Sequence, residues 1–318
     1  MVRIKLMKQK SVGIISGKGG VGKTSLTASL ASLAKDDPIF TVIVLDCDVD
    51  APNLALILPS ECDSNIKSID TYTSFKASFL EEKCNHCGQC IEEHFCEFNA
   101  LKWDDVNSIP KIDYLMCEGC NACKVLCPEH AFEINTVKSG EIISYRSKLG
   151  IYLVYGKTKL GSTTSGKLVS DTKEYLKNLK EYYESNLLLI DGPPGIGCPV
   201  IATLSGLDYV IAICEPTPSG LHDVKRAIEV IQQFNIPFGI IINKADLESP
   251  FQEDFKGYIN KTKHEILGRI PFDLNIPKAM SFAESVIDFS PDSEASLAIK
   301  DIYRKLKDIL LMEYEMRC

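Results

Sequence analysis

Eight of the thirteen cysteines stand in two closely spaced groups, and thiolates at this spacing bind metals. The first group reads C-x₂-C-x₂-C with one more cysteine six residues later, and the second reads C-x₂-C-x₂-C-x₃-C-P. Three such thiols can turn toward one centre, and a fourth completes the ligand set of an iron–sulfur cluster or of Zn²⁺. The eight residues are Cys84, Cys87, Cys90, Cys96, Cys117, Cys120, Cys123 and Cys127.

A second stretch, SGKGGVGKTS, has the pattern of a loop that binds phosphate groups. It follows an apolar run and opens a helical pattern, so a strand should lead into the loop and a helix should follow it. The glycines let backbone N–H groups surround the phosphates, and the helix N-terminus adds partial positive charge. We expect Lys23 to reach the β- and γ-phosphates and Thr24 to bind Mg²⁺. The expected phosphate contacts are Gly17, Gly19, Gly20, Val21, Gly22, Lys23, Thr24 and Ser25.

Apolar runs alternate with amphipathic helical patterns over most of the chain, which predicts an α/β fold with a mostly parallel sheet. The runs are apolar throughout, as expected for strands that helices cover on both faces. The predicted strands span 11–16, 40–46, 151–156, 186–191, 208–215, 237–243 and 264–271. The predicted helices span 23–35, 165–184, 221–234 and 293–312.

This alternation breaks between residues 80 and 137, where apolar runs shorten and the cysteines concentrate. Because the α/β pattern resumes afterwards, we interpret the stretch as a small α+β module inserted into one domain. The expected division is 1–79 for the first part of the α/β domain, 80–137 for the module and 138–318 for the second part. The module contains a weak internal repeat, since each half carries one cysteine group.

Composition and charge narrow the class of protein. The net charge is −8, and residues 80–137 hold 11 Asp and Glu against 4 Lys and Arg, so we expect no binding of nucleic acid there. No apolar run reaches the roughly 18 residues of a membrane-spanning helix, and the N-terminus lacks a signal-peptide pattern. A cytoplasmic location is therefore expected and a membrane partner is not. Thiols stay reduced in that compartment, which favours metal binding over disulfides.

The second cysteine group resembles the bacterial ferredoxin run, in which the fourth cysteine binds the other of two clusters. Zinc stays open as an alternative, because C-x₂-C pairs also suit tetrahedral coordination. Cys96 departs from the ferredoxin pattern, since Glu-Phe follows it where proline is expected. The resemblance implies two [4Fe-4S] clusters, one held by Cys84, Cys87, Cys90 and Cys127, the other by Cys117, Cys120, Cys123 and Cys96.

The phosphate loop reads K-G-G-V-G-K-T and resembles the deviant Walker A loop of the MinD, ParA, Mrp and nitrogenase iron protein group of ATPases. In that group the extra lysine reaches the nucleotide of a second subunit, which implies an ATP-bound homodimer with Lys18 and Lys23 in catalytic roles. LDCDVDAPNL places Asp48 where the group has a switch aspartate that orients the attacking water. LLLIDGPPGIG matches the second switch, where Asp191 would hold Mg²⁺ and Gly195 would sense the γ-phosphate.

Residues that would hold the nucleotide base follow the later strands. Asn243 in IINKAD matches the base-contacting asparagine of the same group, and Pro271 is a weaker candidate. Lys244 and Asp246 complete an N-K-x-D pattern typical of guanine binding, so GTP stays open beside ATP. Cys198 stands at the offset of a cluster-ligating cysteine in the nitrogenase iron protein. The second cysteine that this role needs is not evident, so a structural role is favoured.

Together these residues resemble MinD-superfamily ATPases with an inserted ferredoxin domain, often labelled cobyrinic acid a,c-diamide synthase-like. The resemblance implies that Mg-ATP binding and hydrolysis switch a homodimer and are coupled to electron transfer through two [4Fe-4S] clusters to a redox partner protein. The alternatives are a carrier or scaffold that serves a partner in iron–sulfur or metal-cofactor assembly, and MinD-like spatial positioning. Amide synthesis is least favoured, because the chain has no room for a glutaminase domain.

Overall fold

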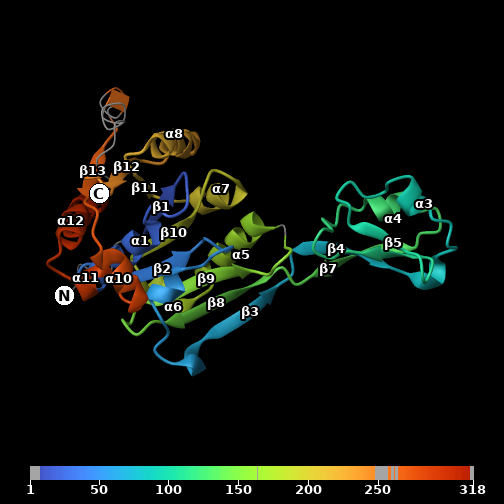
Figure 1. The fold of residues 1–318 in the computed structure, drawn as a ribbon. Helices are drawn as coiled ribbons and strands as arrows, with labels where there is room; N and C mark the ends of the chain where they lie inside the picture. Colours follow the sequence, from blue (N-terminus) through green and yellow to red (C-terminus); the bar gives the residue numbers. More distant parts are fainter. Residues whose placement is uncertain (1–7, 163, 248–256, 259–260, 262–263, 316–318) are drawn as a thin grey trace.

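The computed structural model describes residues 8–162, 164–247, 257–258, 261 and 264–315 (Figure 1). Most of these residues form a body in which helices cover a central sheet, and residues 74–137 form a smaller lobe that projects from it (Figure 1). We call residues 74–137 the cysteine-rich lobe. Among the described residues, no helix is long and apolar enough to cross a membrane.

Over the described residues, the central sheet has nine strands in the order β13-β12-β11-β1-β10-β2-β9-β8-β3. Neighbours from β13 to β9 pair in parallel, whereas β8 and β3 pair antiparallel at one edge. The predicted α/β class with a mostly parallel sheet is therefore confirmed. The strands are β1 (Lys10–Ser16), β2 (Val42–Asp46), β3 (Lys67–Thr71), β8 (Gly140–Arg146), β9 (Tyr152–Thr158), β10 (Leu187–Pro194), β11 (Tyr209–Cys214), β12 (Phe238–Asn243) and β13 (Ile266–Ile270).

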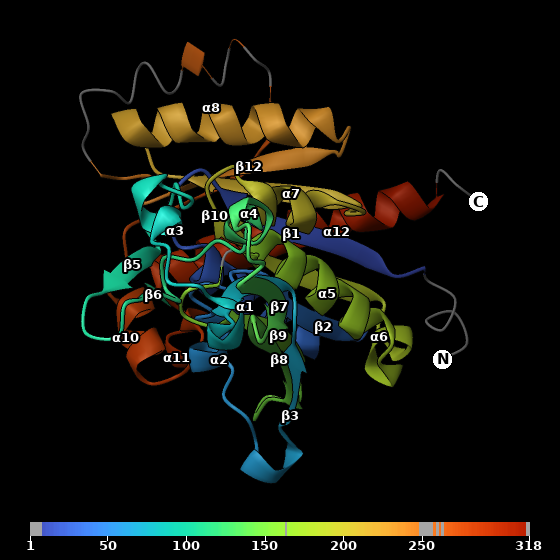
Figure 2. The same cartoon turned by 90° about the vertical axis from the view of Figure 1, so that its right-hand side faces the viewer.

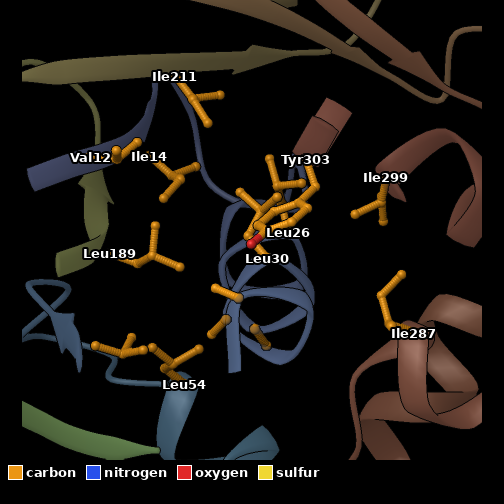
Figure 3. Close-up of a cluster of buried hydrophobic side chains, with 14 of the residues drawn as sticks. Val12, Ile14, Leu26, Leu30, Leu54, Leu189, Ile211, Ile287, Ile299 and Tyr303 are labelled. Atoms are coloured by element: carbon orange, nitrogen blue, oxygen red, sulfur yellow. The ribbon is translucent and has the colours of Figure 1, made fainter. Parts of the chain in front are cut away.

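Helices cover both faces of this sheet (Figure 2). They are α1 (Lys23–Asp36), α2 (Leu54–Ile57), α5 (Ser165–Lys177), α6 (Lys180–Glu184), α7 (Cys198–Leu204), α8 (Pro218–Gln233), α10 (Asn275–Ser281), α11 (Val286–Phe289) and α12 (Glu294–Glu315). Ile14 of β1 packs into the core shared with α1 and α12, whereas Ile15 packs into the core shared with α5, α7 and α8. Figure 3 shows the first of these cores around Leu26 and Leu30 of α1.

The cysteine-rich lobe has two small antiparallel sheets and a core of its own. The lobe contains β4 (Ser74–Phe79) paired with β7 (Phe132–Val137), β5 (Leu101–Asp104) paired with β6 (Ile109–Ile112), and the short helices α3 (Gln89–Glu92) and α4 (Ala122–Leu126). Its core combines Phe95 and Phe132 with several of the cysteines. Because β4 pairs with β7, the separately packed region includes a strand that precedes residue 80.

The two halves of the lobe repeat one local structure. In each half a strand, a loop with three cysteines, one helical turn, a fourth cysteine and a second strand follow one another. The residues on both sides of the middle cysteine have positive φ angles in each half, namely His86, Gly88, Gly119 and Asn121. The first strand of each half pairs with the second strand of the other. The weak sequence repeat therefore corresponds to a structural repeat with exchanged strands.

Some elements of the body differ from the sequence-based expectations. The helix predicted over 165–184 is wrong as one element, because Leu179 is extended (φ −85°, ψ 144°) and packs partly buried against the core between α5 and α6. The strands β3 and β8 were not predicted. In β3 four of the five residues are exposed, so the strand lacks the apolar run by which a buried strand is found.

We expect Leu30→Ala to lower the free energy of unfolding by about 2–5 kcal/mol, because Leu30 is fully buried and its removal leaves a cavity. Leu297→Ala is the matched control, since Leu297 is exposed on α12, and we expect a change within about 0.5 kcal/mol. Urea unfolding followed by circular dichroism measures both. Equal effects of the two substitutions would contradict this assignment of the core.

Candidate functional site

The phosphate loop joins β1 to α1 at the carboxyl end of the sheet, and close packing requires two of its glycines. Gly22 caps α1 with a φ angle of 94°, and a Cβ there would come within 2.5 Å of the side-chain amide of Asn243. A Cβ on Gly17 would lie 2.3 Å from the backbone oxygen of Asp223. Asn243 Nδ2 donates a 2.8 Å hydrogen bond to the carbonyl of Val21, which ties the loop to the end of β12.

Lys23 is buried beneath the loop. Its Nζ donates to Ser16 Oγ at 2.9 Å, and that hydroxyl donates to the carbonyl of Lys18 at 2.6 Å. Burial lowers the pKa of Lys23, and the negative charges of three nearby aspartates oppose this shift. A buried ammonium group at the N-terminus of a helix is well placed to bind the phosphates of a nucleotide.

Asp191 lies on β10 against the first turn of α1. It accepts hydrogen bonds from Thr24 Oγ1 at 2.6 Å and from Thr27 Oγ1 at 3.3 Å. Burial raises the pKa of Asp191 to about 6, while the hydrogen bond from Thr24 and the charge of Lys23 act in the opposite direction. A hydroxyl and a carboxylate next to a phosphate site are the oxygen ligands that Mg²⁺ prefers. Thr24 and Asp191 are therefore the residues that could hold Mg²⁺ with a nucleotide.

Two further aspartates stand at the end of β2, the strand beside β10: Asp46 is its last residue and Asp48 follows it. Asp46 is opposite Asp191 in the sheet and accepts hydrogen bonds from the N–H groups of Asp48 and Leu54 at 2.9 and 3.1 Å. Burial, together with the charge of Asp191, raises the pKa of Asp46 well above its usual value. Burial also raises the pKa of Asp48, whereas the charge of Lys23 lowers it. Asp46 therefore holds the backbone that follows β2 in place. The carboxylate of Asp48 interacts with the charge of Lys23.

Lys18 lies at the outer side of the loop and is partly exposed. Its Nζ is 3.4 Å from Ser219 Oγ and 3.9 Å from a carboxylate oxygen of Glu215. Glu215 also pairs with Lys244 at 2.6 Å. The contacts of Lys18 are long and partly solvated, so breaking them costs little free energy. The side chain is thus free to turn toward another binding group.

An open pocket of about 240 Å³ lies beside the phosphate loop. Pro271 and Phe272 border it from one side, and Asn243 and Lys244 border it near the loop. Asp246 accepts a 2.6 Å hydrogen bond from the N–H of Phe272, which fixes this wall. Both expected base contacts, Asn243 and Pro271, therefore line one pocket next to the phosphate site, together with Gly20, Gly22 and Ser25 of the loop.

Gly195 and Cys198 follow β10 and occupy different surroundings. Gly195 has a φ angle of 92°, and its N–H donates to the carbonyl of Ser16 at 3.0 Å, so it lies next to the phosphate loop. Cys198 is exposed at the start of α7, where it packs near Gly166 of α5. It lies apart from the cysteines of the lobe.

The eight clustered cysteines surround two small cavities of about 20 Å³ each. Three cysteines at each cavity come from one sequence group, and the fourth comes from the other group. This crossed arrangement is the grouping expected from the sequence. One cavity is lined by Cys84, Cys87, Cys90 and Cys127, and the other by Cys96, Cys117, Cys120 and Cys123.

The surroundings of these thiols fit a positively charged metal centre. Burial raises the pKa of Cys90 and of Cys123 to about 11 each, and the other thiols of the same cavity raise it as well. A bound metal reverses this, because a thiol that coordinates it is deprotonated. Backbone N–H groups donate to three sulfur atoms at 3.3–3.4 Å, those of Cys84, Cys96 and Cys117. Over the described residues, no three His, Cys, Asp or Glu side chains form a group sized for one metal ion.

Sequence reasoning missed three polar residues of the nucleotide site: Ser16, Thr27 and Glu215. Ser16 and Glu215 each end or follow an apolar strand, a position at which open parallel sheets bind ligands, so a signal was present. Thr27 lies one turn beyond Thr24 on α1. Only its contact with Asp191 distinguishes it from the other small residues of the helix.

Known proteins share both the sequence and the fold of this chain. Residues 12–286 match the family of CobQ/CobB/MinD/ParA nucleotide binding domains. An uncharacterized protein of Methanocaldococcus jannaschii is 36% identical over 299 residues, which cover 94% of this chain and 97% of the relative. An uncharacterized ATP-binding protein of the same organism is 25% identical over 298 residues, which cover 93% and 87%.

Solved structures of similar fold include the septum site-determining protein MinD of Pyrococcus horikoshii in complex with Mg-ADP. It is 16% identical, the match covers 95% of this chain and 97% of that one, and the TM-score is 0.57. The MinC:MinD cell division complex of Aquifex aeolicus matches with 22% identity and a TM-score of 0.53 over 94% and 96%. At these identities the likeness concerns the fold. The family match and the geometry of the phosphate loop together show that the chain belongs to the CobQ/CobB/MinD/ParA nucleotide-binding family and is an ATPase of the MinD/ParA type.

Proposed function

We propose that this ATPase couples binding and hydrolysis of Mg-ATP to electron transfer through two [4Fe-4S] clusters in the cysteine-rich lobe. The observation that carries the proposal is the gathering of eight thiols into two sets of four, each around its own cavity. Clusters of this kind supply one-electron transfer when they are bound. The partner would be a redox protein or a protein that receives a metal cofactor.

Three properties of the lobe support iron–sulfur clusters over zinc. The second cysteine group has the C-x₂-C-x₂-C-x₃-C-P spacing of two-cluster proteins. The crossed sets of four match the exchange of the fourth ligand that accompanies this spacing. Backbone N–H groups point at sulfur atoms in both cavities, and such hydrogen bonds stabilise the charge of clusters. The inserted module would then be a bacterial-type ferredoxin domain that includes residues 80–137 and the strand β4.

At the nucleotide site, the side chains take the roles that their positions allow. Lys23 would bind the β- and γ-phosphates, and Thr24 and Asp191 would hold Mg²⁺. Asp48 would position the attacking water, and Gly195 would respond to the γ-phosphate because its N–H lies beside the loop. The base would lie in the pocket bordered by Asn243 and Pro271. ATP is favoured over GTP, since the matched relative is an ATP-binding protein and Asp246 is engaged by the backbone.

A homodimer in the ATP-bound state would complete this site. Among the residues that the structure describes, the ammonium group of Lys18 contacts Ser219 and Glu215, over long and partly solvated distances. The triphosphate of a second subunit would offer the ammonium group a stronger partner, because a phosphate oxygen forms a charge-assisted hydrogen bond. Lys18 would then stabilise the charge that develops during hydrolysis in the partner subunit.

MinD-like positioning of another protein is the second candidate, and the likeness of the body to MinD structures supports it. One of these structures is a MinC:MinD complex, which suggests that an ATP-dependent surface of this chain also binds a protein. Membrane attachment through α12 is less favoured, because Ile299, Ile302 and Leu306 are buried against the body. Co-sedimentation with liposomes in ATP and in ADP separates positioning from electron transfer. Transfer of iron and sulfide to an apo-protein would identify a carrier.

We expect Lys23→Met to abolish ATP binding, because the buried ammonium group would be lost from the phosphate site. Lys18→Ala should still bind ATP but lose ATP-dependent dimerisation and hydrolyse ATP at least about 100-fold more slowly. Lys35→Ala is the control, since Lys35 lies in the last turn of α1 and pairs with Asp36. Isothermal titration calorimetry, light scattering and phosphate release measure these effects. A Lys18→Ala protein that dimerises and hydrolyses ATP normally would disprove the role in the partner's site.

Protein purified without oxygen should contain about eight iron atoms per chain, four at each cavity. Cys90→Ser should lose about half of this iron, because it removes one ligand from the first cavity only. Cys62→Ser should lose none, since Cys62 is exposed and lies outside both cavities. Iron and sulfide quantitation with EPR of the reduced protein measures occupancy. Zinc, or metal-free thiols, in the unsubstituted protein would overturn the electron-transfer proposal.

Paired substitutions test the crossed ligation. If Cys127 serves the first cavity, Cys90→Ser with Cys127→Ser should retain the same half of the iron as Cys90→Ser alone. Cys123→Ser with Cys127→Ser should lose both clusters, because the two residues line different cavities. Iron quantitation on the two double variants gives the answer. Uncrossed ligation predicts the reverse, with iron retained in the second pair.

A further inference from the structure

A buried lysine on β4 contacts both the cysteine-rich lobe and the body. Lys76 is 7% exposed, and its Nζ donates to the carbonyl of Cys117 at 2.5 Å and to the carbonyl of Gly161 at 2.7 Å. The N–H of the next residue, Ala77, donates to Cys117 Sγ at 3.4 Å. β4 therefore contacts one residue of the second cavity through both a charged and a neutral donor. Gly161 belongs to the connection between β9 and α5 of the body.

Lys76 carries a buried charge beside Cys117, which lines the second cavity. Within the part of the chain that the structure describes, Lys76 donates to two carbonyl groups and pairs with no carboxylate. A buried ammonium group without a counter-charge is costly, because carbonyl dipoles replace only part of its hydration. Four thiolates around a cluster carry net negative charge, so a cluster in the second cavity would supply the missing counter-charge. Lys76 would in turn favour the reduced, more negative state of that cluster.

Hydroxyl contacts hold the connection between β9 and α5 against the start of β4. Ser162 Oγ lies 2.7 Å from Ser74 Oγ, and Thr164 Oγ1 lies 3.0 Å from Thr73 Oγ1. Ser74 Oγ also lies 3.1 Å from Thr164 Oγ1, so with the contact of Lys76 to Gly161 four side-chain contacts join the described residues of these two segments. A displacement of the connection is therefore expected to move the start of β4 with it.

The same connection is anchored to the segment that follows Asp48. The N–H and Oγ1 of Thr158 both donate to the carbonyl of Val49 at 2.8 Å. Ser165 Oγ donates to Asp50 Oδ1 at 2.8 Å. Asp50 Oδ1 also lies 2.8 Å from Thr158 Oγ1, so the single hydrogen of the Thr158 hydroxyl is shared between Val49 and Asp50. Val49 and Asp50 directly follow the expected switch aspartate, Asp48. If this segment moves, it changes the contacts with Thr158 and Ser165, which stand at the two ends of the connection.

We propose that Lys76 couples the nucleotide site to the cavity lined by Cys117, so that exchange of Mg-ADP for Mg-ATP changes the reduction potential of the cluster held there. The route runs from Asp48 through Asp50 and the connection between β9 and α5 to Lys76. Lys76 acts on the cluster through its charge and its contact with Cys117, and it is a positioning residue. The inference rests on the proposed function, since it needs a cluster in this cavity.

The first test is an EPR-monitored redox titration of anaerobic protein with Mg-ADP and with a non-hydrolysable Mg-ATP analogue. We expect the potential of one cluster to differ between the two nucleotides. In Lys76→Met that potential should fall and the nucleotide-dependent difference should vanish, because the charge and its link are lost. Lys124→Met is the matched control: Lys124 is exposed beside Cys123, and its loss should leave the difference intact. A difference that survives in Lys76→Met overturns the proposal.

Thr158→Val combined with Ser165→Ala provides a second variant that leaves the lobe unchanged and removes both hydroxyl contacts with Asp50. We expect it to remove the nucleotide-dependent difference without lowering the potential measured with Mg-ADP. Circular dichroism and thermal unfolding verify that each variant folds. If Lys76→Met does not fold, Thr158→Val combined with Ser165→Ala decides, and a normal difference in this variant overturns the route through the connection.

Hydrogen–deuterium exchange separates failure of this inference from failure of the proposed function. The two nucleotides should give different exchange rates in peptides that cover 74–79 and 113–121, and Lys76→Met should abolish this difference. The readout needs no electron transfer and applies whichever metal the cavity holds. If protein without iron shows the exchange difference, the proposed function and the predicted change of reduction potential are overturned. The same result would support the structural link between the nucleotide site and Lys76. Exchange that does not respond to nucleotide in unsubstituted protein would overturn the link.

Discussion

Charge buried at the carboxyl edge of the parallel sheet is the constraint on which the nucleotide site depends. Three charged side chains are buried there: Lys23, Asp46 and Asp191. Burial shifts the pKa of each in the direction that favours the neutral form, downward for the lysine and upward for the aspartates. The hydrogen bond that Lys23 donates to Ser16 and the one that Thr24 donates to Asp191 offset part of the cost. A nucleotide bound with Mg²⁺ would supply the remaining counter-charges, with Lys23 binding phosphate oxygens and Asp191 holding the metal. The strand order creates this arrangement by placing β10 between β1 and β2.

The cysteine-rich lobe meets a different constraint, which is the small size of its core. Few apolar side chains are available, and several buried positions are cysteines. Each cavity takes ligands from both halves of the repeat, so a bound metal centre would link segments that are distant in sequence. Metal binding of this kind contributes directly to folding in small domains. The exchange of strands between the two halves has the same consequence for the backbone, because neither half completes its sheets alone.

The junction between lobe and body brings these two sites into one connected structure. The lobe leaves the body through β4 and returns through β7, which pair along their whole length. A paired ribbon is stiffer than two single connections, so displacement at its base is carried along it. At that base Thr73 Oγ1 donates to Ser139 Oγ, and the hydroxyls of Thr73 and Ser74 contact those of the connection after β9. The geometry therefore offers a mechanical route between the phosphate loop and the thiols without a long flexible linker.

Patterns in the sequence were sufficient to predict the phosphate loop with Lys23 and Thr24, the apolar strands of the parallel sheet, and the two sets of thiols. These features depend on neighbours in the chain, so spacing and periodicity reveal them. The sequence did not reveal the edge strand β3, whose exposed residues lack an apolar pattern, or the break at Leu179, which core packing imposes. Only the tertiary structure placed Asp46 opposite Asp191 and Lys76 between Cys117 and Gly161. Such contacts join segments far apart in sequence, and the free energy that selects them comes from burial and strand pairing that no local pattern encodes.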